Sequence, residues 1–140
     1  MLSEAKRPAT ALRRRTLFLE AAAIIEDEYD LRLSLDEVAR RVATSRRQLQ
    51  RAFSEAGETS FRLYVQKVRM DRAAELLRDT RTPVNAVASA VGYRQAAQFA
   101  KAFRRHHGAP PSSFRAAGDG AFTAQGDADI AARARAPLAA

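Results

Sequence analysis

The sequence contains no cysteine among its 140 residues. Without thiols, the chain can form no disulfide, no thiolate metal site and no cysteine nucleophile. It also has no apolar stretch that approaches the ~18 residues of a membrane span, and its charged amino-terminal region lacks the apolar segment of a signal peptide. We therefore expect a cytoplasmic protein with no membrane partner.

Side chains that could form an active site do not cluster either. The sequence shows no Ser-His-Asp arrangement, no glycine-rich phosphate loop and no pair of carboxylates in a cleft-like pattern. His106 and His107 are adjacent, but no Asp, Glu or Cys stands near them at a metal-ligand spacing. We predict a protein that is not an enzyme and has neither a cofactor nor a metal site.

The charge of the chain is strongly uneven. Lys and Arg number 24 against 16 Asp and Glu, and the sequence pI is about 10.9. Residues 31–115 hold 17 basic and 7 acidic side chains, whereas 1–30 and 116–140 each hold slightly more acidic ones. A basic domain with near-neutral flanks indicates a polyanionic partner. The alternative is a solvated surface in an arginine-rich proteome.

One phrase of the sequence occurs twice, about fifty residues apart. Each copy predicts a short helix, a tight break and a second helix with cationic and amide side chains on its outer face. This is the pattern of a helix-turn-helix, which places its second helix in the DNA major groove. The matched positions are Val38, Ala39, Val42, Leu49 and Phe53 in the first copy and Val87, Ala88, Val91, Phe99 and Phe103 in the second.

Local signals mark the helix ends of the first copy. Ser34 with Glu37, and Ser45 with Gln48, are two capping boxes, in which a serine hydroxyl accepts from a backbone N–H three residues on. Gly57 is expected to end the second helix as a left-handed stop.

Proline and glycine mark the helix ends of the second copy. Thr82 is expected as N-cap with Pro83 in the first helical position, and Gly92 and Gly108 as stops. Phe114, beyond them, is expected to plug the second core.

These signals predict an all-α protein with two helix-turn-helix subdomains joined by a long linker helix. We expect a flexible arm at 1–12, the first subdomain at 13–58, the linker helix at 59–79, the second subdomain at 80–115 and a disordered tail at 116–140.

The outer faces of the two second helices differ. The outer side of the first carries Arg46, Arg47, Gln50 and Arg51. Arginine can form two hydrogen bonds with guanine, and glutamine can hydrogen-bond adenine. Gln95, Gln98 and Lys101 share the second outer face, where Ala96 and Ala97 offer at most apolar contact to a thymine methyl. We expect the second copy to position the protein and read DNA shape more than bases.

Other cations are candidates for phosphate contact or for solubility alone. They are Arg40, Arg62, Lys67, Arg81, Arg104, Arg105 and Arg115.

Residues 13–115 resemble the DNA-binding domain of the AraC/XylS family of bacterial transcription regulators. The resemblance rests on Leu35 to Ala39, Ser45 to Phe53, Arg69, Ala73, Leu76-Leu77, Val87-Ala88, Val91 to Tyr93, Phe99, Phe103-Arg104, Gly108, Pro111 and Phe114-Arg115. It implies about seven helices, monomeric binding of double-stranded DNA at an asymmetric promoter site, two adjacent major grooves, and activation by contact with RNA polymerase.

The resemblance also implies which residues contact DNA. The first base-contacting set is Arg46, Arg47, Gln50 and Arg51, and the second is Arg94, Gln95, Gln98 and Lys101. Ala96 and Ala97 stand at positions that are often polar in relatives, so the second set departs from the family pattern.

Residues 1–30 are too few for the ligand-binding domain that many family members carry. The chain thus looks like the stand-alone type, or a fragment of a longer regulator. Two other hypotheses remain open: a nonspecific architectural nucleic-acid binder, and a protein-interaction module whose basic face meets an acidic partner.

Overall fold

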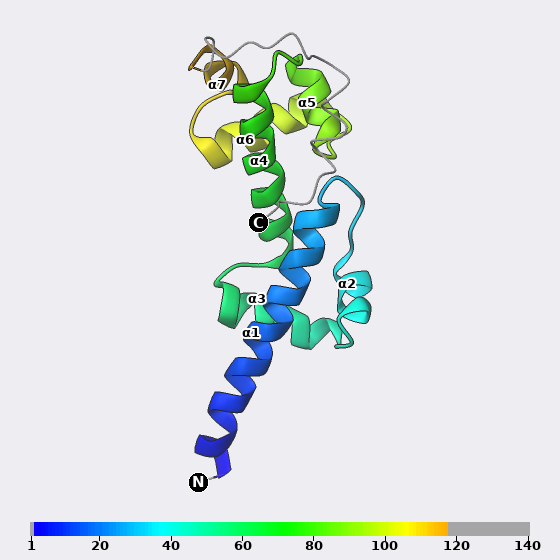
Figure 1. Ribbon diagram of the computed structural model, residues 1–140, viewed down its shortest axis with the longest axis vertical. Helices are drawn as coiled ribbons and strands as arrows, with labels where there is room; N and C mark the ends of the chain where they lie inside the picture. Colours follow the sequence, from blue (N-terminus) through cyan, green and yellow to red (C-terminus); the bar gives the residue numbers. More distant parts are fainter. Residues whose placement is uncertain (1, 118–140) are drawn as a thin grey trace. The chain divides into compact units, whose positions relative to one another are not determined.

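The computed structural model describes residues 2–117, which form seven α-helices and no strand (Figure 1). The helices are α1 (Leu2–Glu28), α2 (Leu35–Arg41), α3 (Arg46–Gly57), α4 (Phe61–Asp79), α5 (Val84–Ala90), α6 (Ala96–His107) and α7 (Pro111–Ala117). The expected all-α fold is confirmed. Of the predicted tail, 118–140 lie outside the described residues, and Ala116 and Ala117 belong to α7.

The chain divides into two compact units. Among the described residues, unit 1 comprises 2–26 and 33–65, and unit 2 comprises 27–32 and 66–117. The division falls within α4, whereas the sequence predicted 59–79 as a linker helix between subdomains ending at 58 and starting at 80. The physical reason is that α4 packs into a core in each unit: Phe61 and Tyr64 join aromatic contacts in unit 1, and Leu77 is buried in unit 2.

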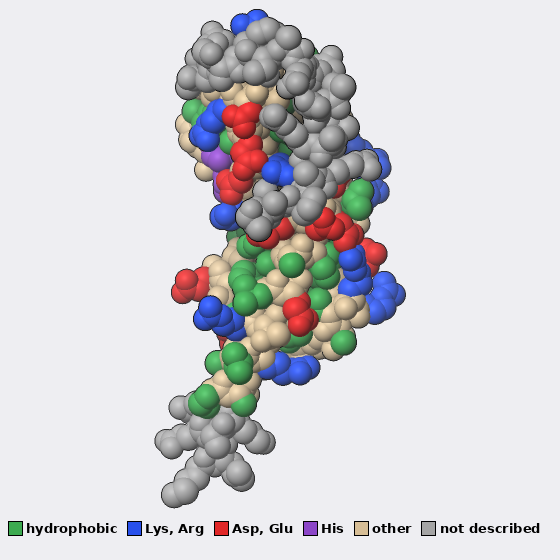
Figure 2. All heavy atoms as spheres, viewed as in Figure 1, with side chains coloured by type: hydrophobic (Ala, Val, Ile, Leu, Met, Phe, Trp, Pro, Cys, Tyr) green, Lys and Arg blue, Asp and Glu red, His purple; other side chains and the backbone are tan. Residues whose placement is uncertain are grey.

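The structure has a helix where the sequence predicted a flexible arm at 1–12, because α1 begins at Leu2. Pro8 lies inside the helix, where it removes one backbone hydrogen bond without ending it. Strong helix formers follow it at Ala9, Ala11 and Leu12, so local propensity favours helix throughout this segment. Figure 2 shows apolar side chains at the surface along α1, where Leu12 is 65% exposed.

Phe53 is the centre of the core of unit 1. Its side chain is fully buried, and its ring lies 5.2 Å from that of Phe18 and 5.9 Å from that of Tyr64. The Tyr64 hydroxyl donates to Glu26 Oε1 at 2.9 Å. Burial of the phenol, reinforced by this carboxylate, raises the pKa of Tyr64 to about 12. The rings from α1 and α4 that surround Phe53 thus hold α3, the second helix of the first repeat, in place.

Phe103 has the corresponding place in unit 2, with Phe99 5.7 Å and Phe114 5.0 Å away between ring centroids. Phe114 therefore closes this core, as expected. Arg69 secures the chain after α1, because its guanidinium donates to the carbonyl oxygens of Tyr29 at 2.7 Å and Leu31 at 3.0 Å.

Two helix ends differ from the predictions. Gly57 is the last residue of α3, and the left-handed position belongs to Glu58 at φ 52°. A Cβ at Gly57 would lie 2.5 Å from Phe18 Cε1, so the glycine makes room for that ring. Thr82 is not the cap of α5: it is 3% exposed, its hydroxyl lies 3.3 Å from that of Thr80, and Pro83 takes the cap position.

Candidate nucleic-acid interface

The first helix-turn-helix consists of α2 and α3. Ser34 Oγ accepts from the N–H of Glu37, and Ser45 Oγ accepts from that of Gln48, each at 3.1 Å. The serine half of each predicted capping box is therefore present. Between the helices the backbone turns through Ala43 at φ 57°. The turn is closed by a hydrogen bond of 2.9 Å from the Thr44 N–H to the Ala39 carbonyl.

One face of α3 is buried and the other is open. Leu49, Ala52 and Phe53 face the core. The four side chains predicted to contact bases are all exposed on this helix, and they are Arg46, Arg47, Gln50 and Arg51. Arg46 Nη1 lies 3.7 Å from Asp36 Oδ2, but both side chains are more than 60% exposed, so water screens this ion pair and leaves it weak.

The second helix-turn-helix consists of α5 and α6 and repeats the same turn. The Tyr93 N–H donates to the Ala88 carbonyl at 2.9 Å, as Thr44 does to Ala39. The second turn is one residue longer, and Arg94 is the added residue. The predicted contact residues are again exposed, with Arg94 and Gln95 before α6 and Gln98 and Lys101 on it.

The predicted phosphate-contact residues are distributed over both units. Exposed ones are Arg40, Arg62, Lys67, Arg81, Arg104 and Arg105. Lys67 Nζ lies 3.0 Å from Asp71 Oδ2, which offsets its charge locally. Arg115 is half-buried and less accessible to a phosphate than the others. Figure 2 shows Lys and Arg side chains at the surface of each unit.

A hollow of about 490 Å³ lies beside α3 in unit 1 and was not predicted from the sequence. Its lining residues are Leu35, Arg46, Gln50, Ser54, Thr59, Ser60, Phe61 and Arg62. Ser60 caps α4, since its Oγ accepts from the Leu63 N–H at 3.1 Å. The one available sequence signal was the serine before this helix; its position beside Arg46 and Gln50 depends on the fold.

None of the helices within residues 2–117 combines the length and apolar character needed to cross a membrane.

Two helix-turn-helix motifs, each with an exposed polar face on its second helix, define a DNA-binding protein. The family model described as a helix-turn-helix domain matches residues 38–117. The chain belongs to the AraC/XylS family of transcription regulators.

Relatives of known sequence agree with this assignment. The chain is 36% identical over 96 residues to the HTH-type transcriptional regulator GbdR of Pseudomonas aeruginosa, a match that covers 69% of this chain and 26% of that protein. It is 32% identical over 93 residues to the regulatory protein SoxS of Escherichia coli, covering 66% of this chain and 87% of SoxS. The Msm operon regulatory protein of Streptococcus mutans is 30% identical, and the chain spans 33% of its length. The chain thus spans a third or less of GbdR and of the Streptococcus mutans regulator.

Solved structures agree as well. An AraC-type DNA-binding regulator from Chromobacterium violaceum has a TM-score of 0.70 at 31% identity, covering 72% of this chain and 90% of that one. The C-terminal domain of AraT, a response regulator from Geobacillus stearothermophilus, has a TM-score of 0.69 at 30% identity, covering 72% and 84%. The chain therefore carries the DNA-binding domain of an AraC/XylS transcription regulator.

Proposed function

We propose that the chain activates transcription by binding an asymmetric promoter site as a monomer, with α3 in one major groove and α6 in the next. The observation that carries this proposal is the presence of two complete helix-turn-helix motifs in one chain, each with its predicted contact residues exposed. Because the two second helices differ in sequence, the DNA site they would read has no two-fold symmetry.

The first motif supplies most of the base reading in this proposal. The amino-terminal residues of a recognition helix contact base edges, and Arg46 and Arg47 are the first two residues of α3. Arg47 and Arg51 would bond O6 and N7 of guanine, and Gln50 would bond N6 and N7 of adenine. Each such pair discriminates against a wrong base by ~1–3 kcal/mol.

The second motif supplies fewer base contacts and more positioning. The first two residues of α6 are Ala96 and Ala97, which have no polar group to offer a base edge. Gln98 and Lys101 follow on the exposed face, and Arg104 and Arg105 continue it toward the end of the helix. Contacts of this kind to phosphates fix register and orientation without reading sequence.

The hollow beside α3 would hold a backbone phosphate next to the bases read by that helix. Thr59 to Arg62 bring the amino terminus of the 19-residue α4 to its wall. Free backbone N–H groups and the helix dipole at such a terminus attract anions. The exposed guanidinium groups of Arg46 and Arg62 add two positive charges around the same space.

The wider role of the protein follows from its family. The AraC/XylS resemblance implies activation of transcription by contact with RNA polymerase, and we extend this mode of regulation to the present chain. Since its proposed partner is chromosomal DNA in a bacterium, the protein would act in the cytoplasm.

Selection from a pool of random DNA duplexes at about 150 mM salt, followed by sequencing, tests the proposal. We expect a motif in two parts, one helical turn apart, with the stronger base preference in one part. The Arg47→Ala, Arg51→Ala double variant should lose the stronger part, whereas Arg13→Ala, Arg15→Ala, which removes two exposed arginines from α1, should leave both.

Sequences without enrichment would refute sequence-specific binding. They would favour the architectural hypothesis, for which the alanines at the start of α6 are the supporting observation.

A further inference from the structure

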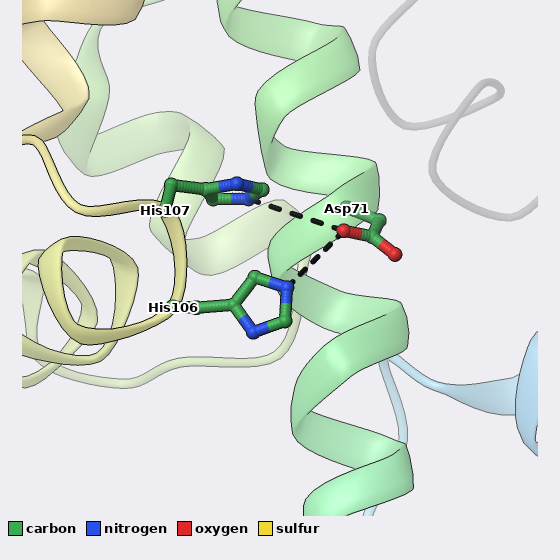
Figure 3. Close-up of side chains that lie close together, drawn as sticks. All are labelled: Asp71, His106 and His107. Carbon is green, nitrogen blue, oxygen red and sulfur yellow. Dashed lines mark hydrogen bonds and ion pairs between the residues drawn. The ribbon is translucent and has the colours of Figure 1, made fainter.

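Unit 2 brings together three side chains that could bind a metal: Asp71 from α4 and His106 and His107 from the end of α6 (Figure 3). His106 Nε2 lies 3.3 Å from Asp71 Oδ1, and His107 Nε2 lies 4.0 Å from the same oxygen. In the sequence the histidine pair has no acidic neighbour, because Asp71 is 35 residues away from His106. The sequence argued against a metal site because no carboxylate stands near the histidines along the chain. The fold brings the Asp71 carboxylate to them.

The spacing of the three groups fits a small ion. One potential ligand atom from each residue lies within 4.8 Å of the other two. Four ligands around zinc at about 2.0–2.1 Å lie roughly 3.4 Å from one another in a tetrahedron. The His106–Asp71 separation already has this value, so mainly a rotation of the His107 ring is needed to complete the geometry.

The chemistry of the ligands selects among metals. Two imidazoles with one carboxylate suit zinc and its transition-metal neighbours, whereas magnesium and calcium prefer oxygen ligands alone. Three protein ligands leave the fourth position of a tetrahedral zinc to water. His106 is exposed and the other two residues are partly exposed, so an ion can enter from solvent.

Some features around the cluster favour the binding of a cation, and others oppose it. His106 and His107 are the last two residues of α6, where the negative end of the helix dipole attracts a cation. Lys67 Nζ lies against Asp71 Oδ2 at 3.0 Å, which leaves Oδ1 as the oxygen nearest the histidines. The His107 Nε2–H also donates to the Met70 carbonyl at 3.0 Å, so metal binding by that nitrogen requires its proton to move to Nδ1.

We propose that Asp71, His106 and His107 form a zinc site that joins α4 to the end of α6 within unit 2. A bound ion would fix the carboxy-terminal end of the second recognition helix against α4. This inference does not depend on how the protein binds DNA, because zinc binding is measured on the free protein.

The composition of the chain makes the experiment unusually clear. The sequence holds only these two histidines and no cysteine. In the full chain without an affinity tag, any imidazole ligand must come from this pair. We would titrate ZnCl₂ by isothermal calorimetry and follow the two histidine side chains by ¹⁵N NMR. The expected result is one zinc per chain, with shifts of both imidazoles.

Three variants test the ligands individually. His107→Phe removes a nitrogen but keeps an aromatic ring beside Phe103 and Phe114, which lie 4.5 and 5.0 Å from the histidine ring. Asp71→Asn and His106→Gln each remove one further ligand. Since even outer-shell partners of metals contribute 10–100-fold to affinity, each variant should weaken zinc binding at least ~10-fold.

Asp79→Asn is the matched control, because it removes an exposed carboxylate from the same helix outside the cluster. It should bind zinc like the unaltered chain. The proposal is overturned if neither imidazole shifts at a tenfold excess of zinc over protein. It is equally overturned if His107→Phe, checked as folded by circular dichroism, binds zinc as tightly as the unaltered chain.

Discussion

The two helix-turn-helix motifs have the same backbone frame. The C-cap residues that follow α2 and α5, Val42 and Val91, share φ −97° and have ψ values of 15° and 12°. Their second helices each contain 12 residues and are followed by a left-handed residue, Glu58 or Gly108. The frame is thus set by backbone geometry and by apolar residues at matched positions.

The charges carried on that frame are distributed differently. Where α3 begins with Arg46 and Arg47, α6 begins with two alanines. Conversely, the last turn of α3 has no basic residue, whereas the last turn of α6 has four basic or imidazole side chains, Arg104, Arg105, His106 and His107. Under the proposed function, the two motifs share one architecture, and this difference in charge would direct the first toward base reading and the second toward holding the DNA backbone.

Helix capping also separates the two motifs. Ser34 and Ser45 cap α2 and α3 through their side chains, whereas Pro83 and Gln95 make no side-chain cap bond to α5 and α6. The helices of the second motif depend more on packing, to which the contact between Phe103 and Phe114 contributes.

The largest effect is expected from removing the central ring of either core. Phe53→Ala and Phe103→Ala each delete a fully buried aromatic side chain at the same position of the repeat. Each should lower the free energy of unfolding by ~3–5 kcal/mol through lost burial and a residual cavity. Denaturant titration gives the loss, and hydrogen exchange should place it in unit 1 for Phe53→Ala and in unit 2 for Phe103→Ala. Loss of protection in the other unit alone would contradict the assignment of the two cores.

The second effect concerns DNA. Arg47→Ala should reduce discrimination between the preferred base and its alternatives by ~1–3 kcal/mol, measured by competition between duplexes. Lys101→Ala should instead weaken binding evenly across sequences and reduce the salt dependence of the affinity. If Lys101→Ala were to change base preference more than Arg47→Ala does, the proposed division of roles between α3 and α6 would be reversed.

The third effect concerns capping. Ser45→Ala removes the hydroxyl that accepts from Gln48 N–H and should lower the free energy of unfolding by ~1 kcal/mol. Gln95→Ala changes the equivalent position of α6, where no side-chain cap exists, and should have little effect. Thermal denaturation of the two variants compares them directly. Equal losses would show that the serine bond adds nothing to α3.

The smallest effect is expected in alkaline solution. The folded state raises the pKa of Tyr64 to about 12 from an ordinary value of 10, so it favours the protonated phenol. This contribution to stability is complete below pH 10 and is lost as the pH rises toward 12, because the unfolded chain ionises first. Burial also raises the pKa of Tyr29 in unit 2. Tyr64→Phe should reduce the fall in stability across this range; an unchanged fall in urea titrations would contradict the prediction.

Much of the fold could be predicted from sequence because its signals are local. The repeated apolar positions and the capping serines located α2, α3, α5 and α6 and the turns between them. Gly57 and Thr82 were misassigned because their roles depend on distant neighbours, the Phe18 ring and the Thr80 hydroxyl.

The predicted DNA-contact residues are all exposed except Arg115, but their contacts with DNA stay predictions. The candidate metal site at the histidine pair could not be predicted from the sequence, because it depends on tertiary proximity. No spacing rule links Asp71 to His106, and only the packing of α4 against the end of α6 brings them together.

The left-handed residues of the first motif suggest a route to a more heat-resistant protein. Ala43 and Glu58 have φ of 57° and 52°, whereas the matching positions of the second motif are Gly92 and Gly108. Side chains with a Cβ are held in that conformation at a cost of roughly 1 kcal/mol or more, which glycine avoids. The second motif therefore provides a template for stabilising the first, and Ala43→Gly and Glu58→Gly are the two substitutions that would copy its glycines.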